Sequence, residues 1–272
     1  MPKQKEKVIL RVCPLFFGMP GMKDICFVLL VMMLAFAYRF SVAQEVQAPV
    51  PRTFNSELPF EVVAMDRHEQ QTAVPAQRVF SAHTPSEDPL EIPECDWWYV
   101  RPLDDQPDWA AVLEEVRRKN IPGLTVYGVD EKVLAQIGEL ENLQWLELGG
   151  RSVDNAKLEH VRGIESLEVL VLQRSSITNA GLAHVGDLGN LEVLSLNAKN
   201  VSDAGLEHLS GLKNLKWLML SGTNVSGTGL AYLKGLESLS RIDLTGDRVT
   251  LAEFEHLAAI ENLKELSLID TP

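Results

Sequence analysis

The chain is poor in cysteine, which removes one class of architecture at once. It has 272 residues and three cysteines, and Cys13 and Cys26 lie within the first 43 residues. Neither a disulfide framework nor a C-x-x-C metal pair is compatible with this pattern. Cys95 stands alone in the remainder, where we expect an inert buried thiol or, alternatively, a cysteine that pairs with another molecule.

Catalytic motifs are missing as well. The sequence contains no G-x-S-x-G, no H-E-x-x-H, no G-x-x-x-x-G-K and no dinucleotide fingerprint. The acidic pairs Asp104-Asp105 and Glu114-Glu115 fall on an expected turn and helix flank, where solvated charge is the ordinary interpretation. We therefore predict that the protein is not an enzyme and needs no cofactor.

Long apolar runs are also rare, and the clearest one lies near the N-terminus, at residues 25–38. Five basic residues precede it, and Ser41-Val42-Ala43 places small residues before Gln44. This pattern is typical of a signal peptide over residues 1–43, with cleavage after Ala43. A retained membrane anchor is the alternative, although Arg39 interrupts the run and a bilayer span needs about 20 apolar residues.

Positive charge is in deficit. The chain has 25 Lys and Arg against 38 Asp and Glu; without residues 1–43 the numbers are 19 and 36, a net charge of −17. Such a surface repels phosphate backbones, so nucleic acid is not an expected partner. A basic protein, a cation or simple solubility fits this charge better.

Residues 44–94 are rich in proline and show neither a helical nor a strand period. We expect a disordered linker there. Residues 95–120 become aromatic and then amphipathic, with Asp108 as an N-cap before a helix that carries Trp109, Val112, Leu113 and Val116 on one face. This segment is predicted to cap the first open coil of the region that follows.

Residues 121–272 are dominated by an internal repeat. The pattern L-x-x-L-x-L begins at residues 143, 167, 191, 215, 239 (with Ile242 as its middle apolar residue) and 263, always 24 residues apart. In each repeat the apolar residues at positions 0, 3 and 5 form a strand with one buried face. Position 11 (Asp154, Thr178, Ser202, Ser226 and Thr250) is expected to cap a short helix whose apolar stripe follows at positions 15, 18 and 21.

These features predict an α/β fold: a right-handed solenoid, or horseshoe, with a parallel sheet on the concave face and short helices on the convex face. Strands stack about 4.8 Å apart and helices about 8–10 Å apart, so the array must bend with its strands inside. The periodicity resembles that of leucine-rich repeat proteins. An internal repeat of this kind is a stronger indication of the architecture than the other sequence signals.

The blocks SDAGLEHLSGLKNLKWLML (202–220) and TNAGLAHVGDLGNLEVLSL (178–196) resemble a short exported subtype of leucine-rich repeat proteins found in planctomycete-like bacteria. In that subtype a T-x-I-T-D-x-G-L segment links strand to helix. Thr223 keeps its first threonine, whereas Arg151, Ser175, Lys199 and Asp247 replace it. The resemblance implies recognition of other proteins and no catalytic residues.

The side chains expected to point outward from the concave sheet give the candidate protein-binding site. They form an apolar patch with a polar flank: Trp145, Glu147, Val169, Val171, Val193, Trp217, Met219, Arg241 and Asp243. Apolar patches rimmed by polar groups mark interaction sites, and tryptophan is frequent in binding hot spots. The alternative is that valine and tryptophan simply suit strands.

Two other features carry open alternatives. His160, His184, His208 and His256 recur at position 17, but helices about 8–10 Å apart cannot bring imidazoles to one zinc ion, so we expect repeat packing and no metal. The last strand, at Leu263–Leu268, ends the array without a covering helix. Its edge is either protected by nearby charges or docks on another chain, as in a homodimer.

The leading hypothesis is an exported, non-catalytic module, secreted, periplasmic or on the cell surface, that binds a protein or peptide on its concave sheet. One alternative is an architectural component of the cell envelope that self-associates through the C-terminal strand. Another is the binding of envelope polysaccharide, with the tryptophans stacked on sugar rings.

Overall fold

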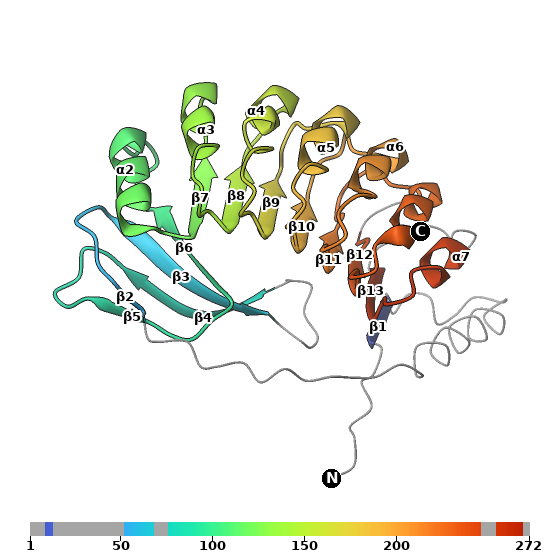
Figure 1. The fold of residues 1–272 in the computed structure, drawn as a ribbon, viewed down its shortest axis with the longest axis horizontal. Helices are drawn as coiled ribbons and strands as arrows, with labels where there is room; N and C mark the ends of the chain where they lie inside the picture. The colour runs from blue at the N-terminus through green and yellow to red at the C-terminus, as the bar shows by residue number, and fades with distance from the viewer. Residues whose placement is uncertain (1–8, 13–51, 68–75, 246–253, 269–272) are drawn as a thin grey trace, which may run out of the picture.

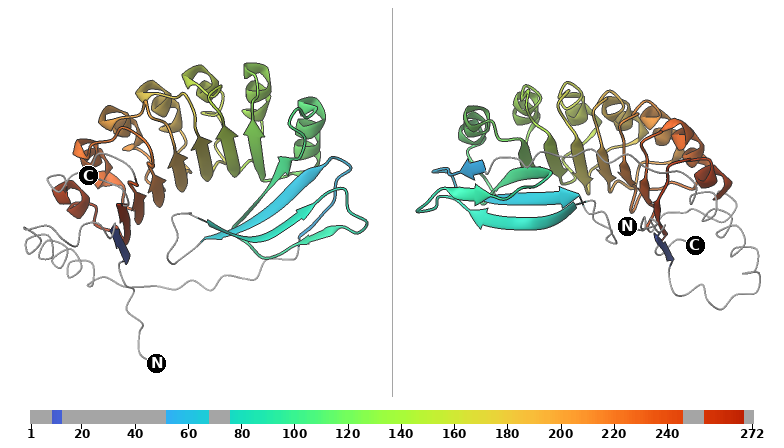
Figure 2. Two further views of the ribbon diagram at one scale, coloured as in Figure 1. Left: turned by 180° about the vertical axis from the view of Figure 1, so that it is seen from behind. Right: turned by 60° about the horizontal axis from the view of Figure 1, so that its bottom comes forward.

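The computed structural model describes residues 9–12, 52–67, 76–245 and 254–268, and these form one curved array of coils (Figure 1). Parallel strands line the inner side of the arc and short helices line the outer side, as the views in Figure 2 also show. The predicted leucine-rich repeat solenoid, of the α/β class, is confirmed.

The concave strands repeat with the period of the sequence. Residues exactly one repeat apart are neighbours in the sheet, as in the row Trp145, Val169, Val193, Trp217, Arg241 and Glu265. The strands are β7 (Gly123–Tyr127), β8 (Trp145–Gly149), β9 (Val169–Gln173), β10 (Val193–Leu196), β11 (Trp217–Met219), β12 (Arg241–Asp243) and β13 (Glu265–Leu268).

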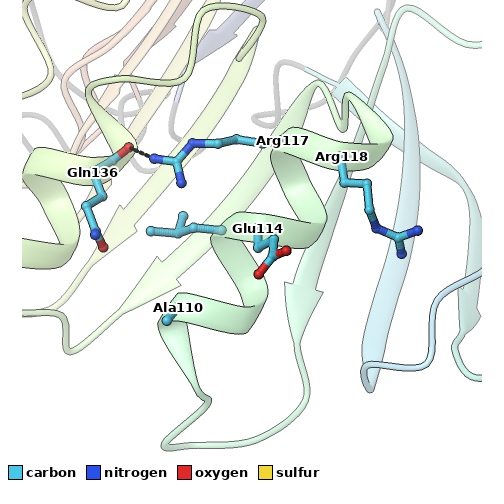
Figure 3. Close-up of a pocket in the computed structure, with 6 residues that line it drawn as sticks. Ala110, Glu114, Arg117, Arg118 and Gln136 are labelled. Atoms are coloured by element: carbon cyan, nitrogen blue, oxygen red, sulfur yellow. Dashed lines mark hydrogen bonds between the residues drawn. The ribbon is translucent and has the colours of Figure 1, made fainter.

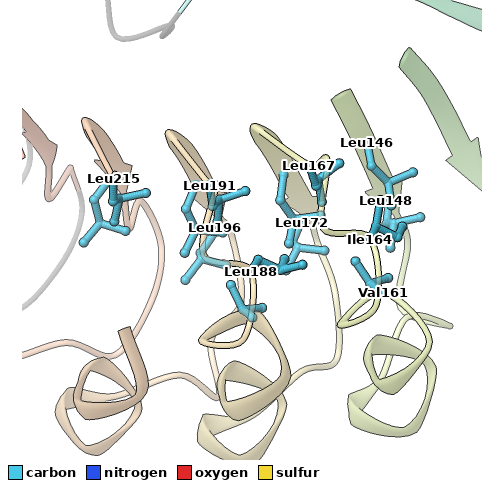
Figure 4. Packing of buried hydrophobic residues seen from close by; sticks show 14 of the residues in the cluster. Leu146, Leu148, Val161, Ile164, Leu167, Leu172, Leu188, Leu191, Leu196 and Leu215 are labelled. Atoms are coloured by element: carbon cyan, nitrogen blue, oxygen red, sulfur yellow. The ribbon is translucent and has the colours of Figure 1, made fainter. Parts of the chain in front are cut away.

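The repeated leucines form the core between the strands and the helices (Figure 4). Leu146, Leu170, Leu194 and Leu218, at position 3 of their repeats, have no exposed side-chain surface. Burial of a leucine contributes roughly 1.5–3 kcal/mol, and each coil obtains this burial only against its neighbours. The fixed interval of 24 residues is thus the distance along the chain from one buried layer to the next.

The convex side consists of short helical segments, some of them 3-10 helices. They are α3 (Glu131–Ile137), α4 (Asn155–Glu159), α5 (Asn179–Val185), α6 (Asp203–Leu206), the 3-10 turns η2 (Glu207–Leu209) and η3 (Thr228–Gly235), and α7 (Phe254–Ala258). Because helices need more room than strands, this side is longer and the array curves around the sheet.

Position 11 plays two roles where we expected one. The Asp154 carboxylate accepts a hydrogen bond from the Lys157 N–H and caps α4, as predicted. Thr178 and Ser202 make no such cap bond. Instead, Asn155 and Asn179 of the preceding coils bond to both the backbone N–H and the hydroxyl at these positions. Thr250 lies outside the described residues.

The segment before the repeats differs from what the sequence predicted. Residues 44–94 were expected to be a disordered linker, but the described part of this segment, 52–67 and 76–94, contains four strands. They are β2 (Arg52–Phe54), β3 (Phe60–Arg67), β4 (Ala76–His83) and β5 (Leu90–Ile92), followed by β6 (Trp97–Pro102). The helix α2 (Trp109–Lys119) begins after Asp108, whose carboxylate accepts from Ala110 and Ala111 N–H groups, as predicted.

The strand β3 was not recognised in the sequence because both of its faces are buried. In β3, Phe60, Val62 and Ala64 belong to the main core, whereas Val63 and Met65 face the opposite side, and all five are buried. A strand that is apolar on both faces loses the polar–apolar alternation by which a half-exposed strand is recognised.

The large sheet has the order β1-β13-β12-β11-β10-β9-β8-β7-β6-β3-β4. β6 is parallel to β7, while β3 is antiparallel to both β6 and β4. At the other end β1 (Ile9–Val12) pairs in parallel with β13, from Ile9 beside Glu265 to Val12 beside Leu268. The edge of the last strand, which we expected to be open, is therefore paired; the rest of the expected signal peptide lies outside the described residues.

Candidate functional site

The concave face is partly covered by the chain itself. We call β3, β4 and β6 the N-terminal strands; in Figure 1 they swing beneath the inner side of the array. Val63, Met65, Trp97 and Tyr99 on these strands form one buried cluster with the concave side chains of β8–β11. The second apolar surface of β3 and β6 is thereby explained, because it packs on the apolar patch of the repeats.

Trp97 holds this contact together. Its ring lies 6.0 Å from that of Trp145 and 6.3 Å from that of Trp217, measured between centroids. Its indole nitrogen donates a 2.9 Å hydrogen bond to Glu168 Oε2, at the start of the third coil. A buried indole with both apolar contacts and a bonded N–H fixes the orientation of the strand that carries it.

Most of the apolar candidate residues are therefore inaccessible, which corrects the expected open patch. Five of them are at most 8% exposed: Trp145, Val169, Val171, Val193 and Met219. Trp145 stacks on Tyr99, with centroids 5.0 Å apart and planes 13° apart. The alternative in which both tryptophans stack on sugar rings loses its basis, because the ring of Trp145 is already occupied.

Trp217, Arg241 and Asp243 lie farther along the same face. Trp217 is only partly buried, and the Arg241 guanidinium lies 5.2 Å above its ring centroid. Arg241 also forms an ion pair with Glu265. Both Arg241 and Asp243 are 6% exposed, so they do not provide the exposed polar flank that the sequence suggested.

What stays accessible is a polar band along the C-terminal ends of β7–β10. We call it the rim; its members are Tyr127, Glu147, Gln173, Ser195 and Asn197, all partly or fully exposed. Glu147 is its centre, since its carboxylate accepts from the Tyr127 hydroxyl at 2.6 Å and from the Thr125 hydroxyl at 3.3 Å. Of the nine candidate residues, Glu147 belongs to this band.

A glycine makes room for the exposed aromatic ring of the rim. A Cβ atom on Gly149 would lie 1.9 Å from the Tyr127 ring, so no larger residue fits without moving that ring. Tyr127 remains 47% exposed at the edge of this contact. Burial, and then the hydrogen bond to the negative Glu147, raise the pKa of the Tyr127 phenol, because both disfavour a second anion there.

The N-terminal strands add a charged group beside the rim. Glu61 is 5% exposed and bonds to Arg78, Arg101 and Ser81. Burial alone would raise the pKa of Glu61, but the Ser81 hydroxyl and the two guanidinium groups outweigh it and lower that pKa. Two guanidinium groups therefore share one buried carboxylate, so these three side chains together carry a net charge of +1 beside the negative Glu147.

Of the rim, only Glu147 is among the site residues predicted from the sequence. Glu147 and Ser195 are at position 4, while Gln173 and Asn197 are at position 6. Tyr127 belongs to the degenerate first coil, for which the 24-residue frame gave no reliable position.

The convex side offers a different depression. It has a volume of about 560 Å³ and lies between α2 and α3 (Figure 3); Ala110, Leu113, Glu114, Arg117, Arg118 and Gln136 line it. Arg117 donates a 3.1 Å hydrogen bond to the Gln136 carbonyl across it. The lining contains no serine, threonine, cysteine or histidine, so it provides no hydroxyl, thiol or imidazole group.

The described residues include neither a possible metal site nor a membrane-spanning helix. Among the described residues, no three His, Cys, Asp or Glu side chains lie close enough to hold a metal ion. Within the same residues no helix is long and apolar enough to cross a bilayer. The apolar run at residues 25–38 lies outside that part of the chain.

No family model and no curated protein matches the chain. Solved structures do. An internalin (inlF) of Listeria monocytogenes is 17% identical over 57% of this chain and 50% of that one, with a TM-score of 0.44. Internalin C2 of the same organism is 23% identical over 57% and 74%, also with a TM-score of 0.44. The chain thus spans half the length of the inlF internalin.

A plant receptor is similar at a lower level. The ectodomain of the receptor kinase GASSHO1/SCHENGEN3 of Arabidopsis thaliana, solved in complex with CASPARIAN STRIP INTEGRITY FACTOR 2, is 19% identical. The match covers 53% of this chain and 20% of the receptor, with a TM-score of 0.34. All these proteins are leucine-rich repeat proteins or internalins, and the likeness concerns the fold.

Proposed function

We propose that the protein is an exported, non-catalytic leucine-rich repeat module that binds a protein or peptide along the rim. One observation carries this proposal: the N-terminal strands occupy the apolar centre of the concave face and leave a continuous polar band beside it. Such a band, next to a rigid buried cluster, offers hydrogen-bonding groups in a fixed arrangement, which lowers the entropic cost of binding.

The chemistry of the rim suits an extended polypeptide. Tyr127 offers a broad ring at low conformational cost, and Gln173 and Asn197 offer amides that can both donate and accept. Export is supported by the basic segment, the apolar run and Ser41-Val42-Ala43 near the N-terminus. The resemblance to short exported repeat proteins of planctomycete-like bacteria supports the same location outside the cytoplasm.

The rim can be tested without knowing the natural partner. Random peptides displayed on phage would be selected on the purified protein, and the enriched peptides measured by fluorescence polarisation. We expect Tyr127→Ala and Gln173→Ala to raise the dissociation constant by about tenfold, as for a binding hot spot. Tyr232→Ala is the matched control, because Tyr232 is 43% exposed and lies in η3 on the convex side. Peptides that bind all these variants equally would contradict the rim proposal.

Self-association through β13 is a second candidate, and the pairing of β1 with β13 supports it, because that edge accepts a parallel strand. If residues 1–43 are removed on export, β1 leaves with them and the edge opens. We then expect light scattering of residues 44–272 to show a mass that rises with concentration. A mass that stays monomeric over the whole range would contradict an architectural role.

A further inference from the structure

The turns that follow β8, β9 and β10 lie side by side at one end of the concave sheet. The Gly150 N–H bonds to the Gln173 carbonyl at 2.9 Å, and the Ser176 hydroxyl bonds to the Arg151 carbonyl at 2.7 Å. The next turn joins them through the bridge between Thr178 and Asn200. These contacts make one continuous surface that begins where the rim ends.

This surface differs in charge from the rest of the protein. Residues 149–153, 173–177, 197–201 and 221–225 contain Arg151, Arg174 and Lys199 but no acidic residue. All three cations are exposed. Within the described part of the chain, no hydrogen bond or ion pair joins the guanidinium groups of Arg151 and Arg174 or the Lys199 ammonium to another residue; Arg151 is bonded only through its backbone carbonyl. We call these three residues the basic row; it carries uncompensated positive charge on a chain with an excess of acids.

Arg174 provides a second, independent observation. Its φ angle is +52°, in the left-handed region that non-glycine residues rarely adopt. Gly150 in the preceding repeat and Gly222 two repeats further on occupy the same position, and both also have positive φ, at 103° and 73°. An arginine therefore stands where the backbone favours glycine, and such local strain is concentrated at functional positions.

From this geometry we infer that the basic row binds an acidic segment of the partner, which deepens the proposed peptide-binding function and rests on it. The three cations come from successive coils, whose strands stack about 4.8 Å apart. Flexible arginine and lysine side chains on such a row can each reach one carboxylate of an extended chain that crosses the turns. Arginine in particular can bind a carboxylate with two parallel hydrogen bonds.

The net charge of the protein argued for a basic partner, and the local arrangement reverses that expectation. Interactions between exposed charges are largely screened beyond about 8 Å at physiological salt, so a ligand on these turns senses the basic row more than it senses the net charge of the whole protein. A nucleic acid is a poorer occupant, because its long, regular polyanion would extend beyond three cations onto acidic surface.

The test uses fluorescein-labelled hexaglutamate and fluorescence polarisation with the purified protein. The variant Arg151→Gln/Arg174→Gln/Lys199→Gln is compared with Arg162→Gln/Lys213→Gln/Lys234→Gln, which removes three exposed cations from the convex side. Both triple variants change the net charge by the same amount. We expect the first to weaken hexaglutamate binding about tenfold and the second less than about twofold, with binding lost at roughly 0.5 M salt.

Two outcomes would overturn the inference. Equal weakening by both triple variants would mean that only long-range charge acts, and tighter binding of a six-nucleotide single strand than of hexaglutamate would favour nucleic acid. Circular dichroism of each variant keeps loss of folding from being taken for loss of binding.

The single variant Arg174→Gly separates binding from strain. Glycine accepts the left-handed conformation, so we expect the melting temperature to be unchanged or higher, while hexaglutamate binding weakens. A variant that keeps full binding would overturn the role of Arg174.

The rim proposal and this inference can fail separately. Display-selected peptides that need Tyr127 but tolerate loss of the basic row would leave the rim proposal standing and refute the acidic segment. Hexaglutamate binding that needs the basic row, together with display-selected peptides that tolerate Tyr127→Ala and Gln173→Ala, would do the reverse.

Discussion

The Tyr99 and Trp145 rings stack with centroids 5.0 Å apart and planes 13° apart, one on β6 and the other on β8. This contact joins the N-terminal strands to the concave face of the repeats. As a result, concave side chains of β8–β11 that the repeat pattern alone would leave exposed are buried. The accessible binding surface therefore moves from the apolar centre to the polar rim and to the turns beyond it.

Trp97 should stabilise the fold through this interior. We expect Trp97→Ala to lower the free energy of unfolding by about 3–5 kcal/mol, as for a buried aromatic side chain. Urea denaturation followed by circular dichroism measures the loss, with Tyr232→Ala as an exposed aromatic control. In a double-mutant cycle with Trp145→Ala, a coupling of about 0.5–1.5 kcal/mol is expected. Additive losses would show that the two rings do not interact.

Asn179, which bonds to the next coil, should contribute more to stability than an exposed asparagine. Asn179 donates to the Ser202 hydroxyl at 2.9 Å and accepts from the Ser202 N–H at 2.8 Å. We expect Asn179→Ala to destabilise the protein by about 1–2 kcal/mol, because it leaves a backbone group unpaired. Asn142→Ala, at an exposed position, should stay within about 0.5 kcal/mol. Equal effects of the two substitutions in urea denaturation would argue against a stabilising role of the Asn179–Ser202 hydrogen bonds.

Glu115 should make the protein sensitive to acid. Burial alone would raise its pKa, but hydrogen bonds from Arg118 and Ser56 and the charge of Lys119 outweigh it and lower the pKa. Such a group contributes stability above the unfolded-state pKa of about 4.3, and that stability is lost as pH falls through the lower folded value. We expect Glu115→Gln to reduce stability at neutral pH and to flatten the loss of stability below about pH 4.

The neighbouring Glu114 supplies the control for that measurement. It is exposed on the same helix, so Glu114→Gln should keep the acid dependence of the native protein. Denaturation with urea at several pH values distinguishes the two variants. A Glu115→Gln protein with an unchanged acid profile would refute the assignment.

Tyr127 should titrate later than an ordinary tyrosine. Burial and the hydrogen bond to Glu147 raise its pKa above the usual value of about 10. The raised pKa means that the folded state retains the proton, so this contribution to stability is present below about pH 10 and is lost as pH rises further. In an ultraviolet titration, Glu147→Gln should bring one tyrosine back toward the usual value, and Tyr127→Phe should remove that tyrosine from the curve.

The leucine period alone determined the solenoid, because burial in such an array depends only on a coil and its neighbour. The strand register and the helix after Asp108 could be predicted for the same reason, because both depend on residues that are close together in the sequence or exactly one repeat apart. Residues 52–94 could not, since Val63 and Met65 of β3 are buried by side chains of β8–β11, which lie far away in the sequence. The proline-rich composition gave no sign of that partner.

The sequence by itself decided which residues face the core and which face the concave side, because side chains alternate along a strand. Only the tertiary structure decided which concave residues remain open. Trp145 and Glu147 lie two residues apart on one face of β8, yet Trp145 is covered by Tyr99 while Glu147 stays at the rim. Exposure depends on contacts between segments far apart in the chain, and a repeat pattern contains no information about them.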